Sequence, residues 1–388
     1  MSEALPLLGG LTAEQFLNEY WQKKPLLIRN AFPDFEPPLS ADELAGLACE
    51  AEIESRILIE EGHSTSNISN WTVEHGPFDE ARFATLPETH WTLLVQGVNT
   101  WVPEVAQLIE PFRFIPDWRI DDIMISYAPE HGSVGAHLDH YDVFLIQAHG
   151  HRHWQINTQI YTEEDCVPDL PIRILKNFTA EQEWTLGPGD MLYLPPNVAH
   201  YGVAQDDCMT YSVGFRAPAK SELLSSFIDD LVPTINETQR YQDNDLPLQE
   251  NSGEISIHAL NKIQNIIRLA ELPDQQINRW YGRYITEVKN PQENNITQHF
   301  ALSDIKEILN NNELVYKDPY SRYAYINSDD ECFLYVNGDE FLCDCGLAKY
   351  LCKHNQYPAQ QLTRFLSDND SSKLLTFLFN HQRLILNL

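Results

Sequence analysis

The chain of 388 residues has no long hydrophobic run and few basic residues. No segment approaches the ~20 consecutive apolar residues of a membrane-spanning helix. The first residues, MSEALPLLGGLTAEQF, contain neither the basic nor the apolar segment of a signal peptide. Only 26 residues are Lys or Arg against 57 Asp and Glu, which gives a formal net charge of −31. We therefore expect no membrane association and no direct nucleic-acid partner, because phosphate binding requires Lys and Arg.

The seven cysteines are odd in number and unevenly spaced. This pattern is not the disulfide framework of a small secreted domain, so we expect reduced thiols and a cytoplasmic location. The segment FLCDCGLAKYLCKH contains four possible zinc ligands, Cys343, Cys345, Cys352 and His354. Its C-x-C spacing is tighter than that of the usual zinc knuckle, and its leucines resemble a buried helix face. Buried thiols are therefore our interpretation, and a zinc site is the alternative.

Hydrophobic residues make up 43% of the chain, enough for substantial cores. Residues 11–22 and 41–50 have the apolar spacing of helices, and Thr12 can cap the first of them. A short strand is predicted after Pro25. From about residue 90, Gly- and Pro-rich clusters separate short apolar and β-branched runs: WTLLVQGV, DDIMISYA, DVFLIQA, RHWQIN, DMLYLP and MTYSVGF. Many short strands with such turns predict a sandwich or barrel.

The sequence pattern changes at Lys220 and again near Gln275. The segment KSELLSSFIDDLVPTI predicts a helix with four inward residues, Leu223, Leu224, Phe227 and Leu231. A second amphipathic helix, in ISIHALNKIQNIIRLAE, has an apolar stripe of Ile257, Leu260, Ile263, Ile266 and Ile267. Two helices alone form little core, so we expect them to pack on the barrel or on another subunit. The remainder mixes helices and strand-like runs in a winged-helix-like order, and its 11 basic and 14 acidic residues exclude a DNA-binding footprint.

The segment HLDHYDVFLIQAHGHRHWQI contains the first candidate metal ligands. His137 and Asp139 are two residues apart, so on an extended chain they project from one face and can bind one cation. His200 follows the rigid Pro195-Pro196-Asn197 turn and offers a third ligand at the mouth of a barrel. Two histidines and one carboxylate form the ligand set of non-haem Fe(II) oxygenases. Without the other features, the alternative interpretation of the His137–Asp139 pair is that His137 is an ordinary surface histidine that binds no metal.

Arg152 shares a strand face with Trp154 and Ile156, which we expect to be the buried face. A buried guanidinium is unfavourable without an anion, and no adjacent carboxylate in the sequence offers itself. A small dicarboxylate ligand would pair with it, although a distant Asp or Glu is the alternative. Ser126 lies in another predicted strand and can donate to the same carboxylate. The apolar run after Asp142 would exclude water from such a site.

Four segments, in this order, resemble the cupin-type JmjC oxygenases: YWQKKPLLIRN, SYAPEHGSVGAHLDHYDVFLIQAHGHRHWQI, GPGDMLYLPPNVAHYG and YSVGFRAP. Within that family they are most similar to the bacterial ribosomal oxygenases, the YcfD-type arginine hydroxylases. The resemblance implies an α+β chain with a double-stranded β-helix (jelly-roll, cupin) domain over residues 1–218. A helical dimerisation region would follow over residues 219–274, and a winged-helix-like domain over residues 275–388.

By the same resemblance, His137, Asp139 and His200 would bind Fe(II), with 2-oxoglutarate and O2 as co-substrates. Arg152 and Ser126 would bind the 5-carboxylate of 2-oxoglutarate. The implied substrate is an arginine of the sixteenth large-subunit ribosomal protein, hydroxylated at its β-carbon by a homodimer, and the acidic charge suits a basic protein. Three alternatives stay open: a histidine hydroxylase of another ribosomal protein, a zinc or manganese hydrolase or isomerase, and a non-enzymatic acidic scaffold that binds ribosomal proteins.

Overall fold

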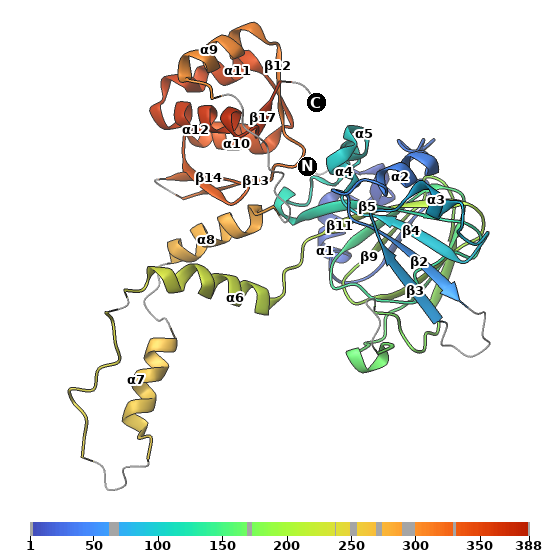
Figure 1. Ribbon diagram of the computed structural model, residues 1–388, viewed down its shortest axis with the longest axis horizontal. Coiled ribbons are helices and arrows are strands. Elements are labelled where there is room, and N and C mark those ends of the chain that lie inside the picture. The colour runs from blue at the N-terminus through green and yellow to red at the C-terminus, as the bar shows by residue number, and fades with distance from the viewer. Residues whose placement is uncertain are drawn as a thin grey trace. The chain divides into compact units, whose positions relative to one another are not determined.

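The computed structural model describes residues 3–61, 70–168, 173–236, 238–248, 254–268, 274–288, 299–328 and 331–386. Residues 249–253, between the two predicted amphipathic helices, and residues 269–273, which include the end of the second helix, lie outside these ranges. The chain divides into two compact units, Met1–Ala217 and Pro218–Leu388 (Figure 1). Among the described helices, none combines the length and the apolar character that crossing a membrane would require.

The N-terminal helix α1 (Ala13–Glu19) begins where the sequence predicts it. The Thr12 hydroxyl accepts a hydrogen bond from the Gln15 backbone N–H at 3.1 Å, and the Gln15 side chain accepts one from the Thr12 N–H at 2.9 Å. This reciprocal capping satisfies two of the free donors of the helix N-terminus. Phe16, on the inner face of α1, is buried against Phe144 and Tyr193 of the sheet described next.

A large antiparallel sheet forms the centre of the first unit. Its strands, in spatial order, are β1 (Leu26–Ile28), β9 (Met191–Leu194), β6 (Val143–His149), β11 (Cys208–Phe215), β5 (Ile120–Ala128), β4 (Trp91–Val95), β2 (Ser55–Glu61) and β3 (Asn70–His75). A second sheet has the order β10 (Ala199–Ala204), β7 (Arg152–Asn157) and β8 (Gln182–Leu186). All six predicted strand runs from residue 90 onward are strands, and the predicted strand after Pro25 is β1. Short helices connect them: α2 (Ala41–Leu47), α3 (Glu80–Phe83), α4 (Val98–Trp101) and α5 (Pro103–Ala106).

The two faces of β6 show how the interior forms. Because side chains alternate along a strand, Phe144 and Ile146 pack in the core that also contains Phe16. Val143 and Leu145 point the other way, into a second core that includes Trp154 and Ile156 of β7. The two sheets therefore enclose one interior between them. This arrangement of antiparallel strands is the jelly-roll architecture that the sequence predicts.

The second unit begins with three helices, α6 (Lys220–Leu231), α7 (Ile257–Ile267) and α8 (Asp274–Thr286). The rest comprises α9 (Leu302–Asn311), β12 (Leu314–Lys317), β13 (Tyr323–Asn327), β14 (Cys332–Val336), β15 (Asp339–Leu342), α10 (Cys345–Lys353), β16 (Gln356–Pro358), α11 (Ala359–Thr363), α12 (Asn369–Asn380) and β17 (Leu384–Ile385). These strands form two small antiparallel sheets, in the orders β16-β12-β17 and β13-β14-β15. Leucines of α9, α10, α11 and α12 pack with them in a single core.

The apolar faces of α6 and α7 are covered to different extents. In α6, Leu231 is buried and Phe227 packs against Trp280 of α8. Leu224 lies outside this contact and is 65% exposed, so the prediction that it faces inward is wrong. In α7, all five residues of the predicted stripe are between 41% and 72% exposed. The stripe is therefore present on the helix but has no cover within the described part of this chain.

Candidate active site

The structure brings His137, Asp139 and His200 together. His137 follows β5 and pairs with His200 of β10 through two backbone hydrogen bonds, N–H to O, of 3.0 and 2.8 Å. The carbonyl of Asp139 accepts a bond of 2.7 Å from the N–H of Asn197, in the Pro-Pro-Asn turn. These backbone contacts hold the three side chains in place, and one ligand atom from each lies within 4.8 Å of the others. The Asp139 carboxylate is 3.7 Å from Nε2 of His200.

Backbone carbonyls orient both imidazole rings. Nδ1 of His137 is 2.9 Å from the carbonyl of Gly135, and Nδ1 of His200 is 3.0 Å from the carbonyl of Val198. A carbonyl only accepts, so each Nδ1 carries the proton and each Nε2 keeps a lone pair for a ligand. These partners could not be identified from the sequence, because every residue has a backbone carbonyl and only the fold determines which carbonyl lies beside each ring.

Burial also keeps His200 in the form that binds metal. The pKa of His200 is lowered to about 4, mainly by loss of solvent and secondly by the nearby His137, while Asp139 and the Val198 carbonyl act in the opposite direction. His200 is therefore neutral at neutral pH. Two neutral imidazole nitrogens and one carboxylate oxygen are the donor set that suits Fe(II), so the residues present fit this metal. Within the described residues, this is the one group of three or more histidine, cysteine or acidic side chains whose ligand atoms converge.

Arg152 lies inside the same interior and has no acidic partner among the described residues. Its strand face is buried, as the sequence predicts, and the side chain is 2% exposed. Nε and Nη2 lie 3.4 and 3.5 Å from the sulfur of Cys208, on the opposed strand β11. A thiol is a weak acceptor and carries no compensating charge. Within the described ranges the guanidinium is therefore a buried cation without a counter-ion, which an anionic ligand would stabilise.

Ser126 faces the same interior from β5. It is buried, and its hydroxyl makes a long contact of 3.4 Å with the carbonyl of Thr210, its partner on β11. Cys208 lies two residues before Thr210, so both point to the same face of β11. Because Cys208 contacts Arg152, Ser126 and Arg152 line one region from opposite sheets. Gln147 of β6 accepts a hydrogen bond from the Thr210 hydroxyl at 3.2 Å.

Sequence reasoning missed Cys208, Thr210 and Gln147 as parts of this interior. A signal was present, because polar side chains alternate with apolar ones in the run CMTYSVGF of β11. Such alternation is also typical of a strand with one solvated face, so the pattern alone does not identify a pocket.

The cysteines of the second unit do not converge on a metal site. Cys343 is buried, and Cys345 and Cys352 are half-buried. The Cys345 thiol contacts the side-chain oxygen of Asn327 at 3.1 Å, and the ring of His354 packs against Tyr350. Burial raises the pKa of the Cys343 thiol to about 12, which disfavours the thiolate that zinc requires. The structure therefore favours the interpretation as buried thiols over the zinc alternative.

Comparison with known proteins agrees with this architecture. Residues 107–223 match the JmjC domain, and residues 262–384 match the ROXA-like winged helix. The chain is 38% identical over 275 residues to the ribosomal protein uL16 3-hydroxylase of Escherichia coli, an alignment that covers 71% of each chain. These matches confirm both the predicted cupin core and the predicted winged-helix domain.

Solved structures extend the similarity to nearly the whole length. An X-ray structure of E. coli ycfD has a TM-score of 0.86 and 32% identity, covering 99% of this chain and all of that one. Another, of YcfD in complex with cobalt and 2-oxoglutarate, has a TM-score of 0.82 and 31% identity, covering 97% and 98% of the two chains. With this identity, fold and convergent donor set, the chain belongs to the family of JmjC-domain ribosomal oxygenases.

Proposed function

We propose that the protein is an Fe(II)- and 2-oxoglutarate-dependent hydroxylase that acts on the β-carbon of an arginine in ribosomal protein uL16. The observation that carries this proposal is the convergence of two imidazoles and a carboxylate in an interior that also contains an unpaired, buried guanidinium. The E. coli relative is named for 3-hydroxylation of uL16, and a structure of YcfD contains cobalt and 2-oxoglutarate. Both support the same chemistry here.

His137, Asp139 and His200 would hold the metal. Bound there with 2-oxoglutarate and O2, a ferrous ion supplies the oxidation of an unreactive C–H bond to an alcohol while 2-oxoglutarate becomes succinate and CO2. The protein contributes position and electrostatics. The carbonyls of Gly135 and Val198 hold the imidazole rings so that each Nε2 is free.

Arg152 and Ser126 would bind the 5-carboxylate of 2-oxoglutarate. Cys208 contacts Nε and Nη2 of Arg152, so this contact orients the guanidinium and leaves donors on Nη1 for a carboxylate. The binding of an anion would also neutralise the buried positive charge. Val143, Leu145 and Leu194 form apolar walls of the same interior and exclude water from it.

The acidic charge favours a basic protein substrate. At −31, the chain attracts a cationic partner and raises the rate of productive encounters, an effect that salt weakens. The target side chain, arginine, is itself a cation. A ribosomal protein substrate also supports the proposal that the enzyme works in the cytoplasm.

We also propose that the protein is a homodimer that uses the exposed stripe of α7. Five large apolar residues on one helix face, between 41% and 72% exposed, favour a second copy as the cover. Ile263→Glu introduces a charge into the stripe, and Gln264→Glu introduces one beside it. Light scattering coupled to size exclusion should give a monomer mass for the first variant and a dimer mass for the second. A dimer mass for both, or a monomer mass for the wild type, would refute this interface.

The substrate assignment is tested in cells of the source organism, with and without this gene. Mass spectrometry of the ribosomal proteins should show one added oxygen on an arginine of uL16 only when the gene is present. An oxygen on a histidine of another ribosomal protein would select the histidine hydroxylase. Unchanged ribosomal proteins, together with no iron-dependent release of succinate by the purified protein, would favour the hydrolase or scaffold alternatives.

A further inference from the structure

Trp154, in the middle of β7, contains a buried donor that no described residue of the chain satisfies. The side chain is 4% exposed, and its indole Nε1–H has no hydrogen-bond acceptor among the described residues. Buried N–H groups in folded proteins nearly always have an acceptor, so an unpaired one indicates either strain or a missing ligand. Trp154 lies on the same strand face as Arg152, whose charge also has no acidic partner in the part of the chain that the structure describes.

The indole stands between the proposed metal ligands and the proposed anion site. In the β7–β10 register, Arg152 is opposite Ala204, Trp154 is opposite Gly202, and Ile156 is opposite His200. The Trp154 ring centroid is 5.9 Å from that of His200 and 5.8 Å from the central guanidinium carbon of Arg152. A ligand that extends from the metal to Arg152 therefore passes this ring.

Gly202 provides the space that the ring occupies. A Cβ atom at position 202 would lie 2.6 Å from the indole of Trp154, closer than carbon atoms approach in proteins. The backbone there has no positive φ, so conformational freedom does not explain the glycine. The cross-strand pair of a glycine and a tryptophan thus holds the indole in this interior position.

We propose that Trp154 is a further co-substrate-binding residue, whose Nε1–H donates a hydrogen bond to a carboxylate oxygen of 2-oxoglutarate. This inference rests on the proposed function, because it requires 2-oxoglutarate to be the ligand of the interior. One diacid then satisfies both unpaired groups of β7, the guanidinium of Arg152 and the indole N–H. The hydrogen bond is charge-assisted and lies out of water, so its removal weakens binding strongly.

Calorimetric titration of 2-oxoglutarate into the zinc-loaded protein tests this proposal without turnover. Trp154→Phe keeps an aromatic ring and loses the N–H, and it should raise the dissociation constant roughly 10- to 100-fold. The matched control is Trp184→Phe, because Trp184 is the cross-strand partner of Trp154 on β8 and packs on the same core. This control should bind 2-oxoglutarate as tightly as the wild type. Equal binding by Trp154→Phe and the wild type would overturn the proposal.

A second measurement works on the wild-type protein and does not depend on the folding of a variant. In a proton–nitrogen correlation spectrum of the zinc-loaded protein, the Trp154 indole resonance should move downfield when 2-oxoglutarate is added. The Trp154 resonance is identified as the one that is missing from the spectrum of Trp154→Phe. If Trp154→Phe does not fold, Gly202→Ala displaces the indole ring and identifies the resonance by its changed chemical shift. A resonance that stays in place while 2-oxoglutarate binds overturns the inference alone, whereas a wild type that does not bind 2-oxoglutarate overturns the proposed function.

Discussion

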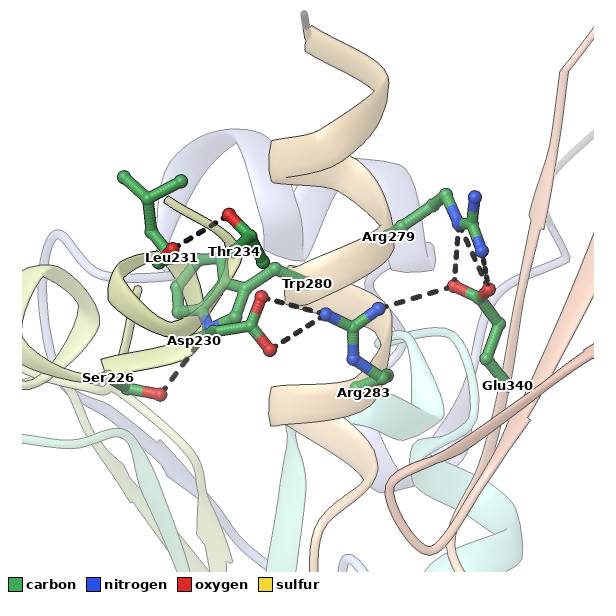
Figure 2. A network of polar contacts seen from close by, with 8 residues as sticks. All are labelled: Ser226, Asp230, Leu231, Thr234, Arg279, Trp280, Arg283 and Glu340. Atoms are coloured by element: carbon green, nitrogen blue, oxygen red, sulfur yellow. Dashed lines mark hydrogen bonds and ion pairs between the residues drawn. The ribbon is translucent and has the colours of Figure 1, made fainter. Parts of the chain in front are cut away.

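Strand β7 and helix α8 use the same kinds of side chain in opposite ways. On β7, Arg152 and Trp154 are buried, and neither has a charged partner or a hydrogen-bond acceptor of ordinary strength among the described residues. On α8, Arg279, Trp280 and Arg283 lie within one helical turn or so of each other (Figure 2). Each of these three is paired with a side chain from another element.

The contacts of α8 connect it to α6 and β15. Arg283 binds both carboxylate oxygens of Asp230, at 2.8 and 2.9 Å, and Arg279 pairs with Glu340 (Figure 2). The indole N–H of Trp280 donates to the Ser226 hydroxyl at 3.4 Å. The polar groups of α8 therefore stabilise the fold of the second unit, whereas we propose that Arg152 and Trp154 of β7 bind a ligand. We therefore expect the presence or absence of a protein partner, and not the residue type, to distinguish structural from ligand-binding arginines and tryptophans in this chain.

The largest effect should come from the loss of a metal ligand. His137→Ala removes one imidazole and keeps the backbone bridge to His200, so turnover of 2-oxoglutarate should fall to background while the thermal midpoint of unfolding stays close to that of the wild type. Succinate release and circular dichroism measure the two effects. The same result is expected for Asp139→Ala. Retained turnover in both variants would contradict the metal site.

Replacement of the two arginines sharpens the comparison. Arg152→Met removes an uncompensated buried charge, so turnover should be lost while the free energy of unfolding stays equal or rises. Arg283→Met removes ion pairs that are about one-third exposed, so it should lower the free energy of unfolding by about 1 kcal/mol or less and leave turnover unchanged. Urea denaturation and succinate release give both quantities. Strong destabilisation by Arg152→Met would show that its charge has a structural role.

The smallest effect is expected at Trp280. Trp280→Phe keeps a packed ring against Phe227 and loses one long hydrogen bond to Ser226. The expected cost is about 0.5 kcal/mol of unfolding free energy, and 2-oxoglutarate should bind with unchanged affinity. Calorimetric titration of this variant, compared with Trp154→Phe, measures what each indole N–H does. Weaker binding of 2-oxoglutarate by Trp280→Phe would contradict the distinction between β7 and α8.

Much of this interior could be predicted from the sequence. The spacing of His137 and Asp139 fixes their common face, and a rigid turn before His200 indicates a positioned third ligand. The structure brings these three together and buries the face that carries Arg152. These predictions depend on local periodicity and on the chemistry of residue types, which a sequence displays directly.

The parts that could not be predicted depend on contacts between distant segments. Cys208 meets Arg152 across 56 residues of chain, and Asp230 meets Arg283 across 53. The sequence shows that Arg152 lacks an adjacent carboxylate. For Arg283 it offers Glu287 at the helical i, i+4 spacing, yet the fold pairs Arg283 with the distant Asp230. The helical spacing of Leu224 likewise predicts an inward side chain, but whether that side chain is covered depends on where α8 packs.

A crystal structure of the protein prepared without oxygen, with Fe(II) and 2-oxoglutarate, tests the central claim most directly. The account predicts one ion bound by His137, Asp139 and His200, with a carboxylate of 2-oxoglutarate paired to the guanidinium of Arg152. An ion bound elsewhere, or a 2-oxoglutarate molecule that leaves Arg152 without an anion, would contradict it.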